Sequence, residues 1–186
     1  MEFPDDLDTY LTSMKEAGAL LSIILALTQP HIFETAFQVI EALHLGTIST
    51  GNPEVVKKAL ANWSFPFTDL TILSNRESPL HRDRHRPFTA FDVMTTFGDY
   101  EHGRFIVPDL NRKFEFNGGS AMVGCTKLFE HGVARTAGQR IELVGGFRPS
   151  MLKRCSIFHE SFLWSKDKYA LHFKGTGQDH VILNAD

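Results

Sequence analysis

Cysteine, surplus positive charge and long apolar runs are all scarce in this sequence, and each shortage excludes a class of protein. Two cysteines, Cys125 and Cys155, stand among 186 residues without any CxxC spacing, so neither a disulfide framework nor a zinc site is indicated. We therefore expect a reducing compartment. The apolar run 17–27 is too short to cross a bilayer, and the acidic segment 1–6 lacks the order of a signal peptide. An intracellular protein of the cytoplasm or nucleus, with no membrane partner, is expected.

The shortage of positive charge restricts the partners. The formal net charge is −3, which argues against a general electrostatic nucleic-acid binder but leaves room for a local basic groove. The length suits one domain with a sizeable core, and we expect a monomer. Sixteen phenylalanines favour an aromatic core or a fold rich in strands.

The order of patterns along the chain predicts an α+β fold within a single domain, 1–186. Apolar residues at helical spacing predict supporting helices in 1–62, at 6–28, 31–45 and 52–62, with Asn52 as an N-cap. Residues 63–148 change to short β-branched and aromatic runs between glycine turns, which is typical of a double-stranded β-helix, the cupin-like jelly roll. The expected strands are 67–74, 88–97, 104–107, 113–116, 121–123, 127–129 and 140–147. The C-terminal extension, 149–186, is expected to hold a helix at 151–162 and a strand at 169–173.

The stretch His81-Arg82-Asp83 is the strongest candidate for chemistry. In a strand, side chains two residues apart point to the same face, so an imidazole and a carboxylate would project together. With one distant histidine, for which we propose His131, they form a 2-His-1-carboxylate facial triad. This donor set leaves open positions on an iron(II) ion for a cosubstrate and dioxygen.

Arg140 follows His131 closely and opens a strong predicted strand. We expect the intervening turn to fold this strand back beside the His131 strand, so that Arg140 enters the same cavity more deeply than the metal. A buried guanidinium holds a carboxylate through two parallel hydrogen bonds. The triad and an inward arginine together are similar to the pattern of iron(II)/2-oxoglutarate dioxygenases.

Several runs of residues also resemble one family. These are Asn75–Asp83, Phe91–Tyr100, Gly103–Leu110, and His131–Val133 followed by Gly138–Arg140. Together they resemble the fungal branch of the TET/J-binding-protein dioxygenases over residues 63–148. The resemblance implies a hydroxylase that uses Fe(II), 2-oxoglutarate and O2 on a modified nucleobase in DNA or RNA, a 5-methylpyrimidine above all.

The resemblance also implies roles for individual residues. His81, Asp83 and His131 would bind iron, and Arg140 would hold the distal carboxylate of 2-oxoglutarate. Asn75 and His85 stand where related enzymes place cosubstrate-site residues. Arg86 replaces an asparagine that contacts the methylated base in the TET pattern, so it is a candidate substrate contact with an altered base preference. Arg76, with the other arginines of this run, forms either a solvated rim or a groove for phosphates or an acidic small substrate.

Other functions stay open on the sequence alone. The same oxygenase chemistry could act on a small molecule or a free nucleoside, which needs no wide basic face. The barrel could also be a non-catalytic binding module, or a cupin-type metal enzyme without 2-oxoglutarate. Arg140 distinguishes the last of these, because such an enzyme does not need a carboxylate-binding arginine.

Overall fold

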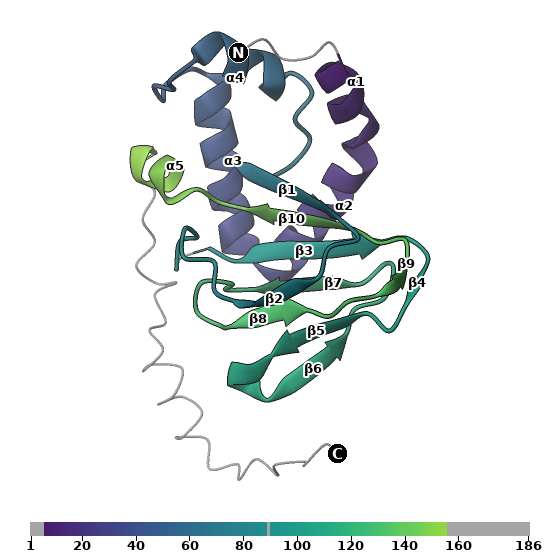
Figure 1. Cartoon of the computed structure of the whole chain (residues 1–186). Coiled ribbons are helices and arrows are strands. Elements are labelled where there is room, and N and C mark those ends of the chain that lie inside the picture. The colour runs from purple at the N-terminus through teal and green to yellow at the C-terminus, as the bar shows by residue number, and fades with distance from the viewer. Residues whose placement is uncertain (1–5, 89, 156–186) are drawn as a thin grey trace, which may run out of the picture.

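Helices cover one face of a sheet, and a second sheet covers its other face, in a computed structural model that describes residues 6–88 and 90–155 (Figure 1). The helices are α1 (Asp6–Ser13), α2 (Lys15–Thr28), α3 (Pro30–His44), α4 (Pro53–Leu60) and α5 (Pro149–Arg154), with a short 3-10 helix at Pro108–Leu110. The expected helical layer is therefore present. It differs in one detail, because the expected helix 6–28 is divided at Met14 into two helices bent by 52°.

The strands form two antiparallel four-stranded sheets. The major sheet has the order β1 (Asp69–Ser74), β10 (Ile141–Gly146), β3 (Asp92–Phe97), β7 (Ala121–Gly124). The minor sheet has the order β2 (Ser78–His81), β8 (His131–Val133), β5 (Arg104–Val107), β6 (Arg112–Glu115). A small pair, β4 (Tyr100–Glu101) and β9 (Ala137–Gly138), completes the set. Two facing sheets with leading helices confirm the predicted jelly-roll class.

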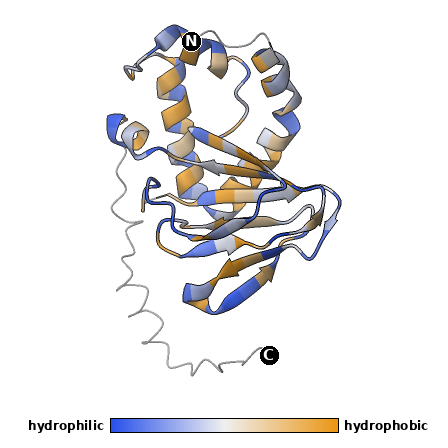
Figure 2. Ribbon diagram, viewed as in Figure 1, coloured by the Kyte–Doolittle hydropathy of each residue, from blue (hydrophilic) through white to orange (hydrophobic). Residues whose placement is uncertain are grey.

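Two cores follow from strand alternation in the major sheet. On the helix side, Val93 and Leu143 pack with Leu21, Leu25 and Phe67, and the apolar sides of α2 and α3 turn toward this face (Figure 2). The adjacent residue Met94 points to the minor sheet and packs with its apolar side chains Phe105, Val107 and Val133. The helices thus support the major sheet from behind and leave its other face to the space between the sheets.

Four expectations about the strands were wrong. β10 does not lie beside β8: it pairs with β1 and β3 in the other sheet. Segment 127–129 is a turn, in which the N–H groups of Leu128 and Phe129 both donate to Cys125 O. β2 was absent from the expected strand ranges, although a strand was assumed at His81–Asp83, and β4 and β9 lie in segments expected to be glycine turns.

Two further observations concern the ends of the chain. The expected helix 151–162 is present as α5, which begins at Pro149 and ends at Arg154, whereas residues 156–162 and the expected strand 169–173 lie outside the described residues. Within 6–88 and 90–155, no single helix is long and apolar enough to cross a membrane, although the bent pair α1–α2 meets the length and composition criteria when taken together.

Candidate metal centre

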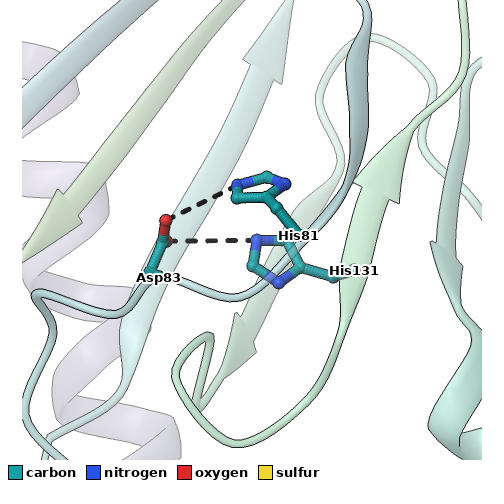
Figure 3. A group of neighbouring side chains, drawn as sticks. All are labelled: His81, Asp83 and His131. Atoms are coloured by element: carbon teal, nitrogen blue, oxygen red, sulfur yellow. Dashed lines mark ion pairs between the residues drawn. The ribbon is translucent and has the colours of Figure 1, made fainter.

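His81, Asp83 and His131 converge at one end of the minor sheet (Figure 3). His81 ends β2 and His131 begins β8, and the two residues are direct partners across this antiparallel pair. Asp83 lies beyond the end of β2, in a turn where its N–H donates to Thr126 O and its carbonyl accepts the N–H of Arg86. The predicted strand therefore stops before Asp83, yet the turn still directs its carboxylate toward both imidazoles.

The donor atoms are close enough to share one ion. Nε2 of His81 is 3.5 Å from Oδ1 of Asp83, and Nε2 of His131 is 4.0 Å from Oδ2. One donor atom from each of the three residues lies within 4.8 Å of the others. These separations suit a metal ion placed between the three donors at ordinary ligand distances.

Backbone carbonyls set the tautomer of both imidazoles. Nδ1 of His81 lies 2.8 Å from Pro79 O, and Nδ1 of His131 lies 3.1 Å from Phe129 O. A carbonyl oxygen only accepts, so each Nδ1 must carry the proton and each neutral ring presents the lone pair of Nε2. This arrangement is typical of histidines that bind a metal through Nε2.

Burial differs between the two histidines. The His131 side chain is 6% exposed and its ring stacks on Phe105, with centroids 5.6 Å apart. Burial lowers the pKa of His131 below its usual value, which keeps the imidazole neutral and able to ligate. The His81 side chain is 43% exposed, so one side of the candidate centre is open to solvent. The residues present fit an iron(II) ion with a buried side and an accessible side.

The candidate centre borders a cavity of about 480 Å³ between the two sheets. The minor sheet contributes His81, His131 and Phe105 to its wall. The major sheet contributes side chains from β1, β3 and β10, among them Thr71, Met94 and Glu142. A molecule that binds the metal and fills this cavity therefore touches both sheets.

A family profile matches most of the chain. The Tet_JBP family, described as the oxygenase domain of the 2OGFeDO superfamily, matches residues 4–159. The chain belongs to this family. Its cofactors are accordingly Fe(II) and 2-oxoglutarate, and the His81–Asp83–His131 triad is the group of side chains able to hold the iron.

One solved structure supports the fold of this Tet_JBP oxygenase domain. NgTET1 in complex with 5mC DNA superposes with a TM-score of 0.61 at 17% identity, over 81% of this chain and 55% of that one. The domain thus spans about half the length of the NgTET1 chain. An RmlC-like cupin protein from Desulfovibrio desulfuricans is 16% identical, with a TM-score of 0.32 over 41% of this chain and 71% of its own. No curated protein matches the sequence.

Arg140 lies just before β10 of the major sheet and, contrary to expectation, is not among the residues that line the metal cavity. Its side chain is 2% exposed and lies 3.6 Å from Glu142, measured between Nη1 and Oε2, and its Nη2 donates to Arg76 O. Nε and Nη1 of Arg140 have no hydrogen-bond partner among the described residues. A buried guanidinium with unused donors fits the distal carboxylate of 2-oxoglutarate.

Glu142 is a residue that the sequence analysis missed. It lines the cavity, whereas Arg140 itself is not part of the cavity wall in the described residues. Its Oε2 is buried and has no hydrogen-bond donor among those residues, and burial raises its pKa despite the nearby charge of Arg140. The sequence feature that could have identified Glu142 is its position two residues after Arg140 in an apolar strand, because this spacing puts both side chains on one face.

Asn75 orients Arg140 from outside the cavity. Its Oδ1 accepts the backbone N–H of Arg140 at 2.7 Å, and its Nδ2 donates to Gln139 Oε1 at 2.8 Å. Asn75 adopts the left-handed backbone conformation, with φ of 51°, which asparagine tolerates better than most residues. Its predicted contact with 2-oxoglutarate stays a prediction, while its support of the Arg140 backbone is direct.

Two of the remaining predicted site residues, His85 and Arg86, line a second, basic cavity of about 370 Å³. Asp83 and Arg86 line both this cavity and the metal cavity, and His85 lines only the basic one. Arg76 lines only the metal cavity. The Arg86 guanidinium is engaged by Asp69 and Asp92. The predicted cosubstrate role of His85 and the predicted substrate roles of Arg76 and Arg86 stay predictions.

Proposed function

We propose that this domain is an Fe(II)/2-oxoglutarate-dependent dioxygenase that hydroxylates a C–H bond of a modified nucleobase, a 5-methylpyrimidine, in nucleic acid. The observation that carries the proposal is the triad on one sheet facing Glu142 on the other across one cavity, with the buried Arg140 guanidinium 3.6 Å from the Glu142 carboxylate. Iron(II) with 2-oxoglutarate and O2 supplies the oxidising chemistry. The protein residues hold the metal and the carboxylate in place.

The basic cavity supports nucleic acid as the substrate. Its wall includes four arginines, Arg82, Arg84, Arg86 and Arg148. Arg82 is paired with Asp109 and Arg148 with Asp69, whereas Arg84 has no ion-pair partner among the described residues. Because this cavity adjoins the metal cavity at Asp83, a phosphate held there would sit beside a base placed at the iron.

An aromatic cavity supports a nucleobase as the reacting group. It measures about 260 Å³, is lined by Phe91, Phe114 and other apolar side chains, and shares Met94, Phe105 and His131 with the metal cavity. A base flipped out of a duplex needs an apolar pocket in which to stack. NgTET1 was solved with 5mC DNA, which makes 5-methylcytosine the first base to test.

The test compares oligonucleotides with free nucleosides. We expect the reconstituted domain to add one oxygen atom to 5-methylcytosine in an oligonucleotide, detected by mass spectrometry and accompanied by succinate. Asp83→Ala should abolish the reaction. Arg84→Gln should weaken oligonucleotide binding and reduce its salt slope by about one, while Arg135→Gln, an exposed arginine outside these cavities, should not.

Other outcomes favour the alternatives. Hydroxylation of a free nucleoside or another small molecule, without salt dependence, would support the small-molecule oxygenase. Binding of metal and 2-oxoglutarate without turnover of any substrate would support a non-catalytic binding module on the same barrel.

We further propose a monomeric protein of the fungal branch of the family, located in the cytoplasm or nucleus.

A further inference from the structure

The carboxylate of Glu142 lies beside the guanidinium of Arg140. The distal carboxylate of a keto acid would need the same guanidinium. Both side chains are buried, at 2% and 3% exposure for Arg140 and Glu142. Their closest polar atoms are 3.6 Å apart, beyond a good hydrogen bond, and both retain buried polar atoms without partners among the described residues. The pair is thus close enough to neutralise charge but leaves its hydrogen-bonding capacity unused.

The charges of Arg140, Glu142 and an incoming carboxylate do not balance while Glu142 is ionised. With Glu142 ionised, the Arg140–Glu142 pair is neutral, and a second carboxylate would bring a net negative charge into a buried space. Burying an unpaired charge is strongly unfavourable. The incoming carboxylate binds favourably only if Glu142 gives up its own charge, and a proton from solvent on its carboxylate achieves this while turning an acceptor into a donor.

We propose that Glu142 occupies Arg140 in the absence of a keto acid, and that 2-oxoglutarate binds together with one proton taken up by the Glu142 carboxylate. This inference rests on the cosubstrate role of Arg140 in the proposed function and not on the identity of the substrate. It makes Glu142 a positioning residue that sets the affinity for dicarboxylic keto acids and its dependence on pH.

The groups around Glu142 are consistent with such coupling. Burial already raises its pKa, and the charges of Arg140 and His81 lower it. The residues opposite Glu142 on the flanking strands, Leu73 and Thr96, are uncharged. The other charged or titratable side chains on the wall of the same cavity are Arg76, Asp83, Arg86 and His131. A second carboxylate beside Arg140 offsets the charge that favours ionised Glu142, so its pKa rises on binding.

The direct test is proton uptake by the full, unmodified chain. The protein is first saturated with Mn(II), so that protons released by the metal ligands are not counted. 2-Oxoglutarate is then titrated calorimetrically at about pH 8 in two buffers of different ionisation enthalpy. We expect uptake of about one proton per keto acid, and a dissociation constant that rises about tenfold per pH unit above the titration of Glu142. Pyruvate, which lacks the distal carboxylate, should bind without proton uptake.

Glu142→Gln is the matched variant, because the amide keeps the shape and removes the charge. It should bind 2-oxoglutarate more tightly than the wild type at about pH 8, with no proton uptake and a flat pH dependence. Glu101→Gln, at a glutamate whose side chain is 81% exposed, should behave as the wild type.

Three results would overturn the proposal: no proton uptake by the wild type, undiminished uptake by Glu142→Gln, or no binding of 2-oxoglutarate at all. Should Glu142→Gln fail to fold, proton uptake by the wild type still decides the matter. Failure to hydroxylate any nucleobase would refute the proposed substrate and leave this inference intact, since the measurement uses no substrate.

Discussion

Arg86 shows how a single buried charge holds the site in place. Its Nη1 lies 2.7 Å from Asp69 of β1 and its Nε lies 3.2 Å from Asp92 of β3. Arg86 therefore connects the turn that follows Asp83 to two strands of the major sheet. We predict that Arg86→Gln lowers the free energy of unfolding by about 3–5 kcal/mol, because it leaves buried carboxylates unpaired. Denaturant unfolding measures this, with the exposed neighbour Arg84→Gln expected within about 0.5 kcal/mol of the wild type. An equal loss in both variants would contradict the prediction.

Asp92, a partner of Arg86, makes the free energy of unfolding depend on pH. Burial raises its pKa to about 7, although Arg86 and the Thr126 hydroxyl lower it. The folded state therefore keeps a proton that the unfolded chain releases above about pH 4. The free energy of unfolding should fall as pH rises from about 4 to about 7, by roughly 4 kcal/mol from this group. Asp92→Asn should remove this part of the slope in unfolding measured across pH, and an unchanged slope would refute it.

The residues that the sequence could identify are those whose partners are near in the chain or whose chemistry is distinctive. His81 and Asp83 were predicted from their spacing, and His131 from the need for a third ligand. The ion pairs of Arg86 could not be predicted, because Asp69 and Asp92 become its neighbours only when the sheets form. Glu142 was missed because its partner was assumed to face only the cosubstrate.

At the scale of elements, the close packing of β2 on β8 sets the distance between the two histidines. A Cβ added at Gly132 would lie 2.8 Å from Ser78 O and 3.2 Å from Leu80 N, both backbone atoms of β2. We predict that Gly132→Ala displaces β2 and weakens metal binding about 10–100-fold, the range found when support of metal ligands is disturbed. Metal titration checks this.

Gly124→Ala is the matched control for Gly132→Ala. Gly124 also lies in a strand, and a Cβ there meets nothing within 4 Å. The control should therefore bind metal as the wild type does. Equal metal affinity in the two variants would show that β2 adjusts without moving His81.

Helices were predicted better than strand neighbours, and the reason is physical. The N-cap at Asn52, whose Oδ1 accepts the N–H of Val55, and the apolar spacing of α2 and α3 depend on residues close in sequence. Strand order in a jelly roll depends on distant pairings. The expectation that β10 returns beside β8 applied the common rule that successive strands are neighbours, whereas the chain crosses to the other sheet between them.

At the scale of the whole molecule, the candidate metal ligands and the arginine proposed to bind the cosubstrate belong to different sheets. All three candidate ligands belong to β2, β8 and the turn after β2, whereas Arg140 and Glu142 belong to the β10 side. A 2-oxoglutarate molecule bound to the metal at one end and to Arg140 at the other would join the two sheets. Neither component alone makes this connection, because the metal touches one sheet and the keto acid alone lacks its anchor on that sheet.

We therefore predict that metal and 2-oxoglutarate stabilise the fold synergistically. With Mn(II) present, 2-oxoglutarate at about a hundredfold excess over its dissociation constant should add about 2.7 kcal/mol. That increment corresponds to a rise in Tm of roughly 5–10 °C for a domain of this size. Without metal, or in Asp83→Ala, the same concentration should raise Tm by far less. Thermal unfolding of the protein alone, with Mn(II), with 2-oxoglutarate and with both measures the synergy. A gain from 2-oxoglutarate that is equal with and without metal would mean that the keto acid does not connect the triad to Arg140.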